Sequence, residues 1–223
     1  MNPTLESNRV AKQKRTIWIT VGILVLFIVS VITSVVLQTL AAKPDMKSAL
    51  EDYQVIWFNA PRLIPDVALV DHNGEAFSIE QLKGQWDLIN FGYTYCPDIC
   101  PTNMADMNIT HRLLGEQGLA EQISFWMITV DPARDTTEQL SLYVPYFNEE
   151  FVGLTGDIES IQTIATALSA VFYQEGTEAG YTVAHSDNYA VIDPNGHLVA
   201  ILRPPHNPQA MAEVLAIMIQ ANY

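Results

Sequence analysis

The apolar and polar positions divide the chain into two parts of different character. Residues 17–40 form a run of 24 residues without a charged side chain, which at about 1.5 Å per residue exceeds a hydrocarbon core of about 30 Å. From residue 61 to residue 223, apolar runs of strand length alternate with runs that have helical spacing. The pattern predicts a membrane-spanning helix followed by a folded domain of the α/β class.

Turn-forming residues separate the predicted elements of this domain. Two strands are continuous apolar runs, as buried strands are, and each of two hairpins contains an Asn-Gly turn. The expected strands are 67–70, 76–79, 86–92, 123–130, 151–154, 189–192 and 198–202, and the expected helices are 100–117, 136–147, 158–172 and 208–221. This order predicts one central sheet, partly parallel, with helices on both faces and antiparallel hairpins at its edges.

Charge is distributed as unevenly as hydropathy. The chain has 11 basic and 25 acidic residues, a formal net charge of −14. Residues 1–16 contain four bases and one acid, a net charge of +3, whereas residues 43–223 contain 7 bases and 24 acids, a net charge of −17. A protein that neutralises phosphates needs clustered Lys and Arg, so we expect no nucleic-acid partner.

The basic residues before the apolar run predict its orientation. Short segments rich in Lys and Arg remain on the cytoplasmic side, so residues 1–16 are expected inside, as a basic arm, and the domain outside. A cleaved signal peptide would have a shorter apolar core and a small-x-small cleavage site, which Leu40-Ala41-Ala42 fits poorly. We therefore expect an uncleaved transmembrane anchor at residues 17–40.

The remaining boundaries and the location follow from the same pattern. Residues 41–60 lack strong periodicity and are expected to be a tether, which leaves residues 61–223 as one domain. The basic arm is too short and too poor in hydroxyl side chains to be an organelle transit peptide. We therefore expect a single-pass protein of a bacterial inner membrane with its domain in the periplasm.

The only two cysteines of the chain, Cys96 and Cys100, lie together in the segment FGYTYCPDICP. They follow the predicted strand 86–92 and open a helix, where free backbone N–H groups and the helix dipole favour a thiolate. Four residues apart near a helix start, the sulfurs are close enough for a disulfide or for a shared soft metal ion. A purely structural disulfide is an alternative, although so short a loop would constrain the unfolded chain little.

A metal site would need a ligand beyond two sulfurs, and five histidines are available. His185 differs from the others because it lies in a predicted loop that leads into strand 189–192, at one end of the sheet. Its position in the chain alone makes His185 only a candidate for the third metal ligand. The histidines that we expect to be solvated or to pack are His72, His111, His197 and His206.

Several other residues near the predicted strand ends could be proposed as ligands. Asp131, Arg134 and Asp135 follow strand 123–130, and we interpret them mainly as a structural loop with a hydrogen-bonded arginine. The two methionines of helix 100–117 have the spacing of core residues rather than of thioether ligands. The residues expected to pack rather than to bind a ligand are Tyr93, Tyr95, Met104, Met107 and Trp126.

Four segments of the domain form a specific combination. They are FGYTYCPDICP at 91–101, TVDPARDT at 129–136, GLTG at 153–156, and the stretch from His185 through Tyr189 to the DPNG turn at 193–196. Together they resemble the SCO/SenC family of copper proteins. The resemblance extends from about Pro61 to Tyr223, and the predicted anchor in front of it fits as well.

The resemblance implies a membrane-anchored protein with a thioredoxin-like fold that assists assembly of the CuA centre of cytochrome c oxidase. Carried over by position, it implies copper ligands at Cys96, Cys100 and His185, and it permits a redox-active disulfide between the two cysteines. One position departs from the family, where Asp often precedes the histidine and this chain has Ala184. An acid that tunes the histidine would then come from elsewhere, with Asp187 as the candidate.

The implied partners are the copper-bearing subunit of a cytochrome c oxidase, a thiol-disulfide reductant and the membrane. Two thiolates and one imidazole suit Cu(I) in three-coordination, and Cu(II) with a further oxygen ligand. Structural zinc would want a fourth protein ligand. We therefore predict a metallochaperone that delivers copper to the oxidase subunit or prepares its CuA site.

The sequence leaves other functions open. The main alternative is a thiol-disulfide oxidoreductase that uses Cys96 and Cys100 as an exchanging pair, although thioredoxin-type enzymes use Cys-x-x-Cys and carry a proline where none precedes Tyr189. A peroxidase would have Thr three residues before its reactive cysteine, where this chain has Tyr93. A copper buffer that binds the metal without delivering it is the remaining possibility.

Overall fold

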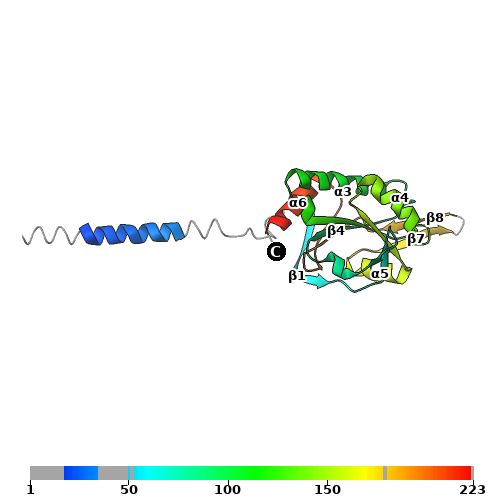
Figure 1. The fold of residues 1–223 in the computed structure, drawn as a ribbon, viewed down its shortest axis with the longest axis horizontal. Coiled ribbons are helices and arrows are strands. Elements are labelled where there is room, and N and C mark those ends of the chain that lie inside the picture. The colour runs from blue at the N-terminus through cyan, green and yellow to red at the C-terminus, as the bar shows by residue number, and fades with distance from the viewer. Residues whose placement is uncertain (1–17, 35–49, 51–52, 178–179, 222–223) are drawn as a thin grey trace, which may run out of the picture. The chain divides into compact units, whose positions relative to one another are not determined.

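The computed structural model describes residues 18–34, 50, 53–177 and 180–221, and the chain divides into two compact units, Met1–Pro44 and Asp45–Tyr223. In the first unit, residues 18–34 form a helix with exposed side chains, drawn in blue in Figure 1. Within the described ranges, no helix is both long enough and apolar enough to cross a membrane. The predicted anchor at residues 17–40 lies partly outside those ranges, so it stays a prediction.

The second unit is built on a mixed sheet of eight strands among the residues described (Figure 1). The three strands β4, β5 and β6 are parallel to one another, and antiparallel strands extend the sheet on both sides. In sheet order the strands are β1 (Val55–Leu63), β10 (His197–Leu202), β9 (Tyr189–Ile192), β4 (Trp86–Gly92), β5 (Ile123–Thr129), β6 (Val152–Gly156), β2 (Leu69–Asp71) and β3 (Ala76–Phe77). Every residue of β4 is buried, as its continuous apolar run predicts.

Helices cover both faces of this sheet, as expected from the alternation of elements. One face packs against α3 (Ile99–Glu116), α4 (Thr137–Phe147) and α6 (Pro208–Ala221), and the other against α5 (Ile158–Ala167) and the short helix η1 (Ile79–Leu82), as Figure 1 shows for the α-helices. Two of the helices, α4 and α5, begin at capping side chains: Thr136 accepts a hydrogen bond from the Gln139 N–H, and Asp157 accepts one from the Ser160 N–H. The predicted α/β architecture is confirmed.

Three sequence expectations are wrong in detail. The tether was expected to reach residue 60, but Val55–Leu63 forms β1, because pairing with β10 supplies an order that its irregular pattern, interrupted by a bulge and Pro61, does not reveal. The helix expected at 158–172 ends at Ala167. Two residues later, Ser169 takes a left-handed backbone conformation with φ of 60°. The sequence did not indicate this end, because the left-handed residue that follows a helix is more often a glycine.

The third error concerns the segment before β9, which was expected to be a loop. It contains a hairpin of two strands, β7 (Phe172–Thr177) and β8 (Gly180–His185), which forms a sheet of its own. The side chains of β7 are mostly exposed and only one residue of β8 is buried, so the hairpin has little of the apolar alternation by which strands are recognised. His185 is therefore the last residue of a strand and not part of a loop.

The topology brings three segments to one edge of the large sheet. β4 and β5 are parallel and in register, with Gly92 opposite Thr129, so the segments that follow them leave from the same edge. β9 is antiparallel to β4, and its first residue, Tyr189, is opposite Asn90, so the segment that precedes β9 arrives there as well. These segments carry the cysteines, the loop after β5 and His185.

Candidate metal centre

The two cysteines are placed by the turn between β4 and α3. The Cys96 N–H donates to the Tyr93 carbonyl oxygen at 3.2 Å, which closes the turn, and Cys100 lies in the first turn of α3. The Cys100 N–H is directed at Cys96 Sγ, 3.5 Å away, so the sulfur accepts one of the N–H groups that a helix start leaves unpaired. Both cysteines are free thiols.

Gly92, the last residue of β4, lies against the side chain of Cys100. A Cβ atom at position 92 would lie 3.4 Å from Cys100 Sγ and 3.4 Å from Met127 Cε. Pro101 occupies the first helical turn, where a missing N–H group costs little. Cys100 therefore lies in the core, where its side chain is fully buried.

His185 reaches the cysteines from the end of β8. Its Nε2 atom lies 3.2 Å from Cys100 Sγ, and its Nδ1 atom lies 3.0 Å from the Ser186 carbonyl oxygen. A carbonyl oxygen can only accept, so Nδ1 carries the hydrogen and the Nε2 lone pair is directed toward the sulfur. This is the tautomer that a metal ligand bound through Nε2 needs.

The structure brings together the three residues that the sequence pattern singles out. One ligand atom from each of Cys96, Cys100 and His185 lies within 4.8 Å of the other two. Cys100 is buried, whereas Cys96 and His185 are partly exposed, so a metal ion held by the three would be reachable from the surface. Two soft sulfurs and one imidazole nitrogen at this spacing fit copper better than a hard cation.

Burial dominates the electrostatics of Cys100. It raises the pKa of the Cys100 thiol far above its ordinary value, and the neighbouring Cys96 sulfur adds to the shift. The expectation that the helix start favours a thiolate is therefore wrong for Cys100, because desolvation outweighs the helix dipole in a fully buried group. A bound cation would supply the positive charge that the buried thiolate lacks.

The aromatic residues around the site have different roles. Tyr93 is buried, and its ring meets the His185 ring edge to face at 6.1 Å, so it packs directly against a candidate ligand. Tyr95 is 54% exposed and does not pack a strand end, contrary to expectation. Trp126 is buried as expected, and its indole N–H donates to Asp87 Oδ1 at 2.7 Å.

The remaining candidates do not join the three ligands. Met104 and Met107 are fully buried in the core, as predicted. Asp187, expected as the acid that tunes His185, accepts a hydrogen bond from Asn103 Nδ2 at 2.5 Å instead, because the backbone turns at Ser186 and presents its carbonyl oxygen to the imidazole. The partner of His185 is thus a backbone group, which sequence patterns do not reveal.

The four other histidines take the structural roles that were expected. His72 Nδ1 accepts the Gly153 N–H at 2.9 Å, and His111 packs edge to face on Phe125. His197 starts β10, and its Nδ1 atom lies 3.7 Å from an Asp193 oxygen. His206 packs against the Tyr189 ring at 4.4 Å between centroids.

The loop that follows β5 is structural, as predicted, and lies beside the site. Arg134 forms an ion pair with Asp131, and Asp135 is fully buried. The carboxylate of Asp135 accepts hydrogen bonds from the Thr94 N–H at 3.0 Å, the Thr94 hydroxyl at 2.6 Å and the Thr129 hydroxyl at 2.6 Å. Thr94 belongs to the cysteine turn, so this loop supports the turn.

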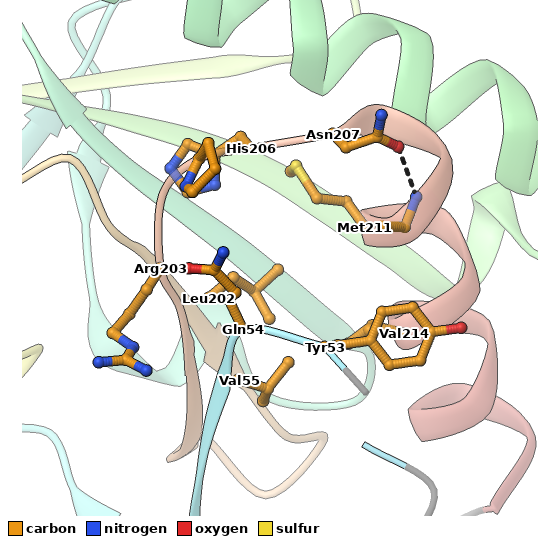
Figure 2. Close-up of a pocket in the computed structure, with 11 residues that line it drawn as sticks. Tyr53, Gln54, Val55, Leu202, Arg203, His206, Asn207, Met211 and Val214 are labelled. Atoms are coloured by element: carbon orange, nitrogen blue, oxygen red, sulfur yellow. Dashed lines mark hydrogen bonds between the residues drawn. The ribbon is translucent and has the colours of Figure 1, made fainter. Parts of the chain in front are cut away.

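A separate cavity of about 180 Å³ lies between the start of β1, the end of β10 and the start of α6 (Figure 2). Its wall is largely apolar, with Val55, Leu202 and Val214 among the lining residues, and none of the three candidate ligands lines it. One lining residue, His206, connects the cavity to the segment that follows His185. Its Nε2 atom donates to the Asp187 carbonyl oxygen at 2.8 Å. The chemistry therefore points to the cysteine-histidine cluster and not to this cavity.

The SCO1/SenC family model matches residues 59–220. The chain belongs to this family. A Stutzerimonas stutzeri protein, provisionally named a copper-binding protein, is 40% identical over 174 residues, which cover 77% of this chain and 84% of that protein. The mouse mitochondrial SCO1 homologue is 36% identical over 142 residues, which cover 62% of this chain and 50% of that protein.

Solved structures of Sco proteins have the same fold. Arabidopsis thaliana ScoI with copper bound superimposes with a TM-score of 0.66 at 26% identity and covers 72% of this chain and 99% of its own. Bradyrhizobium japonicum ScoI with copper bound gives a TM-score of 0.62 at 30% identity, covering 70% of this chain and 99% of its own. These similarities confirm the thioredoxin-like α/β fold with a mixed central sheet.

Proposed function

We propose that this protein binds one copper ion between Cys96, Cys100 and His185 and delivers it to the copper-bearing subunit of a cytochrome c oxidase. The observation that carries the proposal is the convergence of two sulfurs and one imidazole nitrogen within 4.8 Å in a member of the SCO1/SenC family. Relatives with copper bound support the metal, and one solved relative is described as belonging to the Sco family of cytochrome c oxidase assembly proteins.

The donor set accounts for how the metal would be bound. Cu(I) is a soft ion, and thiolate ligands select it over harder cations. Binding would displace the thiol protons of both cysteines, so affinity is expected to fall as the pH is lowered. The imidazole of His185 binds as a neutral ligand, with Nδ1 held by the Ser186 carbonyl oxygen.

The apolar run at residues 17–40 supports a membrane anchor with the domain in the periplasm. The proposal rests on its length, its lack of charge and the four basic residues that precede it. Anchoring would place the domain on the same membrane as an oxidase subunit, and shared tethering raises the effective concentration for a transient encounter.

Titration of the reduced full-length chain in detergent with Cu(I), against a competing chelator, tests the binding site. We expect one tight site per chain, weakened about 100-fold by His185→Ala, because losing one of three ligands removes roughly 3 kcal/mol of binding free energy. His197→Ala, with its side chain at the start of β10, is the matched control and should leave the affinity unchanged. Equal affinities for the parent and His185→Ala would refute the assignment.

Delivery needs its own measurement. Copper-loaded protein mixed with the soluble copper-binding domain of the oxidase subunit, followed by separation of the two proteins, should show the metal on the subunit. His185→Ala should transfer less copper because it arrives less fully loaded. Metal that stays on this protein at equilibrium, with an unloaded subunit, would indicate a copper buffer instead.

A second function, thiol-disulfide exchange, is supported by the unequal exposure of the two cysteines. Cys96 is partly exposed and Cys100 is fully buried, which suits an attacking thiol and a resolving thiol. Cys96 would attack a target disulfide to form a mixed disulfide, and Cys100 would then displace the reduced target. Two electrons and two protons pass to the target, and an external thiol reductant must reduce the resulting Cys96–Cys100 disulfide.

The midpoint potential of the cysteine pair separates the two functions. A reductase needs a potential below that of its target disulfide, and each 30 mV of difference corresponds to about 1.4 kcal/mol. Turnover of an oxidised oxidase subunit with a thiol reductant, abolished by Cys96→Ser, would support the reductase. Copper transfer without such turnover would support the metallochaperone alone.

A further inference from the structure

The hairpin that carries His185 is attached to the domain through few contacts. β7 and β8 form a sheet separate from the eight-stranded one, the side chains of β7 are mostly exposed, and Val183 is the one residue of β8 that is buried in the core. At its base, Ser186 and Val171 close the hairpin, with the Ser186 N–H donating to the Val171 carbonyl oxygen at 2.9 Å. Whatever holds the hairpin against the domain therefore also determines where the imidazole lies.

The principal attachment is a cluster formed by Asp131, Arg134 and Tyr181. The Tyr181 hydroxyl donates to Asp131 Oδ1 at 2.8 Å, and the guanidinium of Arg134 donates through Nε to Asp131 and through Nη1 to the Tyr181 carbonyl oxygen. The same guanidinium lies over the Tyr181 ring, with Cζ 3.8 Å from the centroid. One arginine from the β5–α4 loop thus contacts the backbone and the side chain of β8 together.

Tyr93 forms a second attachment beside the first. Its hydroxyl accepts the Val183 N–H of β8 at 3.3 Å, and its ring meets the His185 ring edge to face. Arg134 Cζ lies 5.6 Å from the centroid of the Tyr93 ring, so the two attachments share the same guanidinium. Tyr93 also begins the turn that places Cys96, whose N–H it accepts.

The same loop holds the cysteine side of the site. Asp135, next to Arg134, accepts the N–H and the hydroxyl of Thr94, and the Thr155 hydroxyl donates to the Asp135 carbonyl oxygen at 3.0 Å. Residues 131–135 therefore contact the cysteine turn through Asp135 and through Arg134, whose Cζ lies 4.9 Å from the Tyr95 ring centroid. They contact the histidine hairpin through Arg134 and Asp131. Among the described loops, only this one makes side-chain hydrogen bonds to both the cysteine turn and the histidine hairpin.

We propose that the segment Asp131–Asp135 is a bracket that sets the spacing between the cysteine sulfurs and the histidine, with Arg134 as the positioning residue for His185. This inference rests on the proposed copper site. Arg134 would not touch the metal. It would hold β8 so that Nε2 of the imidazole stays within reach of the sulfurs, and it would thereby slow the loss of copper.

Two variants remove different numbers of the contacts that form the bracket. Arg134→Gln removes the ion pair and the ring contacts while keeping a polar, uncharged side chain that is shorter than arginine, and Tyr181→Phe removes only the hydroxyl that donates to Asp131. Arg112→Gln, an exposed arginine of α3 paired with Glu116, is the matched control. The full-length protein is loaded with Cu(I), and the rate of copper loss to a chelator is measured together with thermal unfolding.

We expect Arg134→Gln to lose copper about tenfold faster than the parent, the lower end of the effect of residues that orient metal ligands. Tyr181→Phe should lose it about threefold faster by the same reasoning, because it breaks one of several contacts, and Arg112→Gln should match the parent. The thiolate-to-copper absorption band of the Cu(II) form should shift in Arg134→Gln, since the imidazole is no longer held in place. Arg134→Lys should rescue only in part because an ammonium cannot make the forked contact.

A double variant separates positioning from general stability. In a His185→Ala background the bracket has no imidazole to position, so adding Arg134→Gln should not change copper loss further. A further acceleration in that background would overturn the proposal, because it would show that Arg134 acts through the fold as a whole. Copper loss within twofold of the parent in both Arg134→Gln and Tyr181→Phe would overturn it too.

Hydrogen exchange of the Val183 amide tests, without copper, whether the bracket holds the hairpin. In the reduced copper-free protein, this amide should exchange about tenfold faster in Arg134→Gln, an increase that reports easier local opening of the hairpin. Unchanged exchange would overturn the bracket, whatever copper does. If instead Val183 exchanges faster but His185→Ala binds copper as the parent does, the bracket holds the hairpin but the proposed copper site, and with it the positioning role, is wrong.

Discussion

The two halves of the candidate metal centre are built in opposite ways. The cysteines lie on a turn between a fully buried strand and an 18-residue helix, and the Cys100 side chain has no exposed surface. The histidine lies at the end of a two-stranded hairpin outside the main sheet, held by the β5–α4 loop, by Tyr93 and by the buried side chain of Val183. A rigid half and a lightly attached half thus meet at the 3.2 Å contact between Cys100 Sγ and His185 Nε2 and at Tyr93, whose hydroxyl accepts the Val183 N–H.

The difference indicates which ligand can leave. Moving Cys100 would require repacking the core, whereas moving His185 requires that the hairpin separate from the β5–α4 loop and from Tyr93 and that Val183 leave its buried position. Local openings of weakly packed segments cost much less free energy than global unfolding. We therefore expect His185, and not Cys100, to move when the hairpin opens.

The strongest test of the rigid half is Cys100→Ser. We expect a loss of copper affinity of about 100-fold or more, because a hard hydroxyl replaces a soft thiolate and one ligand of three is lost. The measurement is Cu(I) titration of the full-length chain, with circular dichroism to check the fold. Affinity within threefold of the parent would show that Cys100 is not a ligand and would remove the distinction between the two halves.

Asp135→Ala should destabilise the fold at the point where the rigid half is held. The variant leaves the Thr94 and Thr129 groups without their buried acceptor, and three lost hydrogen bonds at roughly 1 kcal/mol each give about 3 kcal/mol. Urea unfolding of the reduced copper-free protein measures it. Asp157→Ala, which removes the exposed cap of α5, is the control and should cost only about 1 kcal/mol.

Asp87 provides a prediction away from the metal centre. Burial raises its pKa to about 7, against the opposing hydrogen bond from Trp126. The folded state therefore holds a proton on Asp87 that the unfolded state, with an ordinary pKa near 3.8, has already lost, so stability falls as the pH rises from about 4 to about 7 and then levels off. Asp87→Asn should remove this loss.

We expect Asp87→Asn to raise the free energy of unfolding at pH 8 by about 2 kcal/mol and to lower it by about 1.5 kcal/mol at pH 4, where the folded state gains nothing from removing the charge and the cost of the buried amide remains. Each pKa unit corresponds to about 1.4 kcal/mol, but the gain is reduced because the new amide buries N–H groups for which the structure offers no evident acceptor. Urea unfolding at both pH values measures it, and Cu(I) affinity should not change. Equal stabilisation at both pH values would argue against a protonated Asp87.

The smallest effect is expected for Ala184→Asp on the hairpin half. It restores the acid that family members often carry before the histidine, but successive side chains of a strand point to opposite faces, so the carboxylate should not reach the imidazole of His185. We expect copper affinity to change by less than about threefold, as for an exposed charge that is screened by solvent. A larger increase, measured by the same titration, would show that the hairpin twists enough to bring the carboxylate to the imidazole.

The parts of the fold that the sequence predicted share one property: each contacts the core through a repeating pattern. β4 was placed at residues 86–92 because this segment is largely apolar and bounded by turn residues, and α6 was placed at 208–221 with a proline in its first turn. The hairpin β7–β8 was missed because exposed strands carry no such pattern. The end of α5 was missed because Ser169 takes a conformation that sequence patterns associate with glycine.

The candidate site divides in the same way. Cys96 and Cys100 could be named from the chain alone, since they are the only cysteines and lie close in sequence. His185 lies 85 positions from Cys100 and became a strong candidate only through the family resemblance. Tyr181 was not singled out at all, because nothing in its local sequence marks the hydrogen bond that its hydroxyl donates to Asp131.

By itself, the sequence determined the class of fold, the paired cysteines and the charge-free run at residues 17–40, because these depend on composition and on spacing along the chain. Only the tertiary structure decided that the histidine arrives on a hairpin, that its Nδ1 is held by a backbone carbonyl oxygen and that Arg134 attaches that hairpin to the cysteine side. These features depend on contacts between segments far apart in the chain. Such contacts are fixed when the sheet aligns the ends of β4, β5 and β9 at one edge, and no local pattern records them.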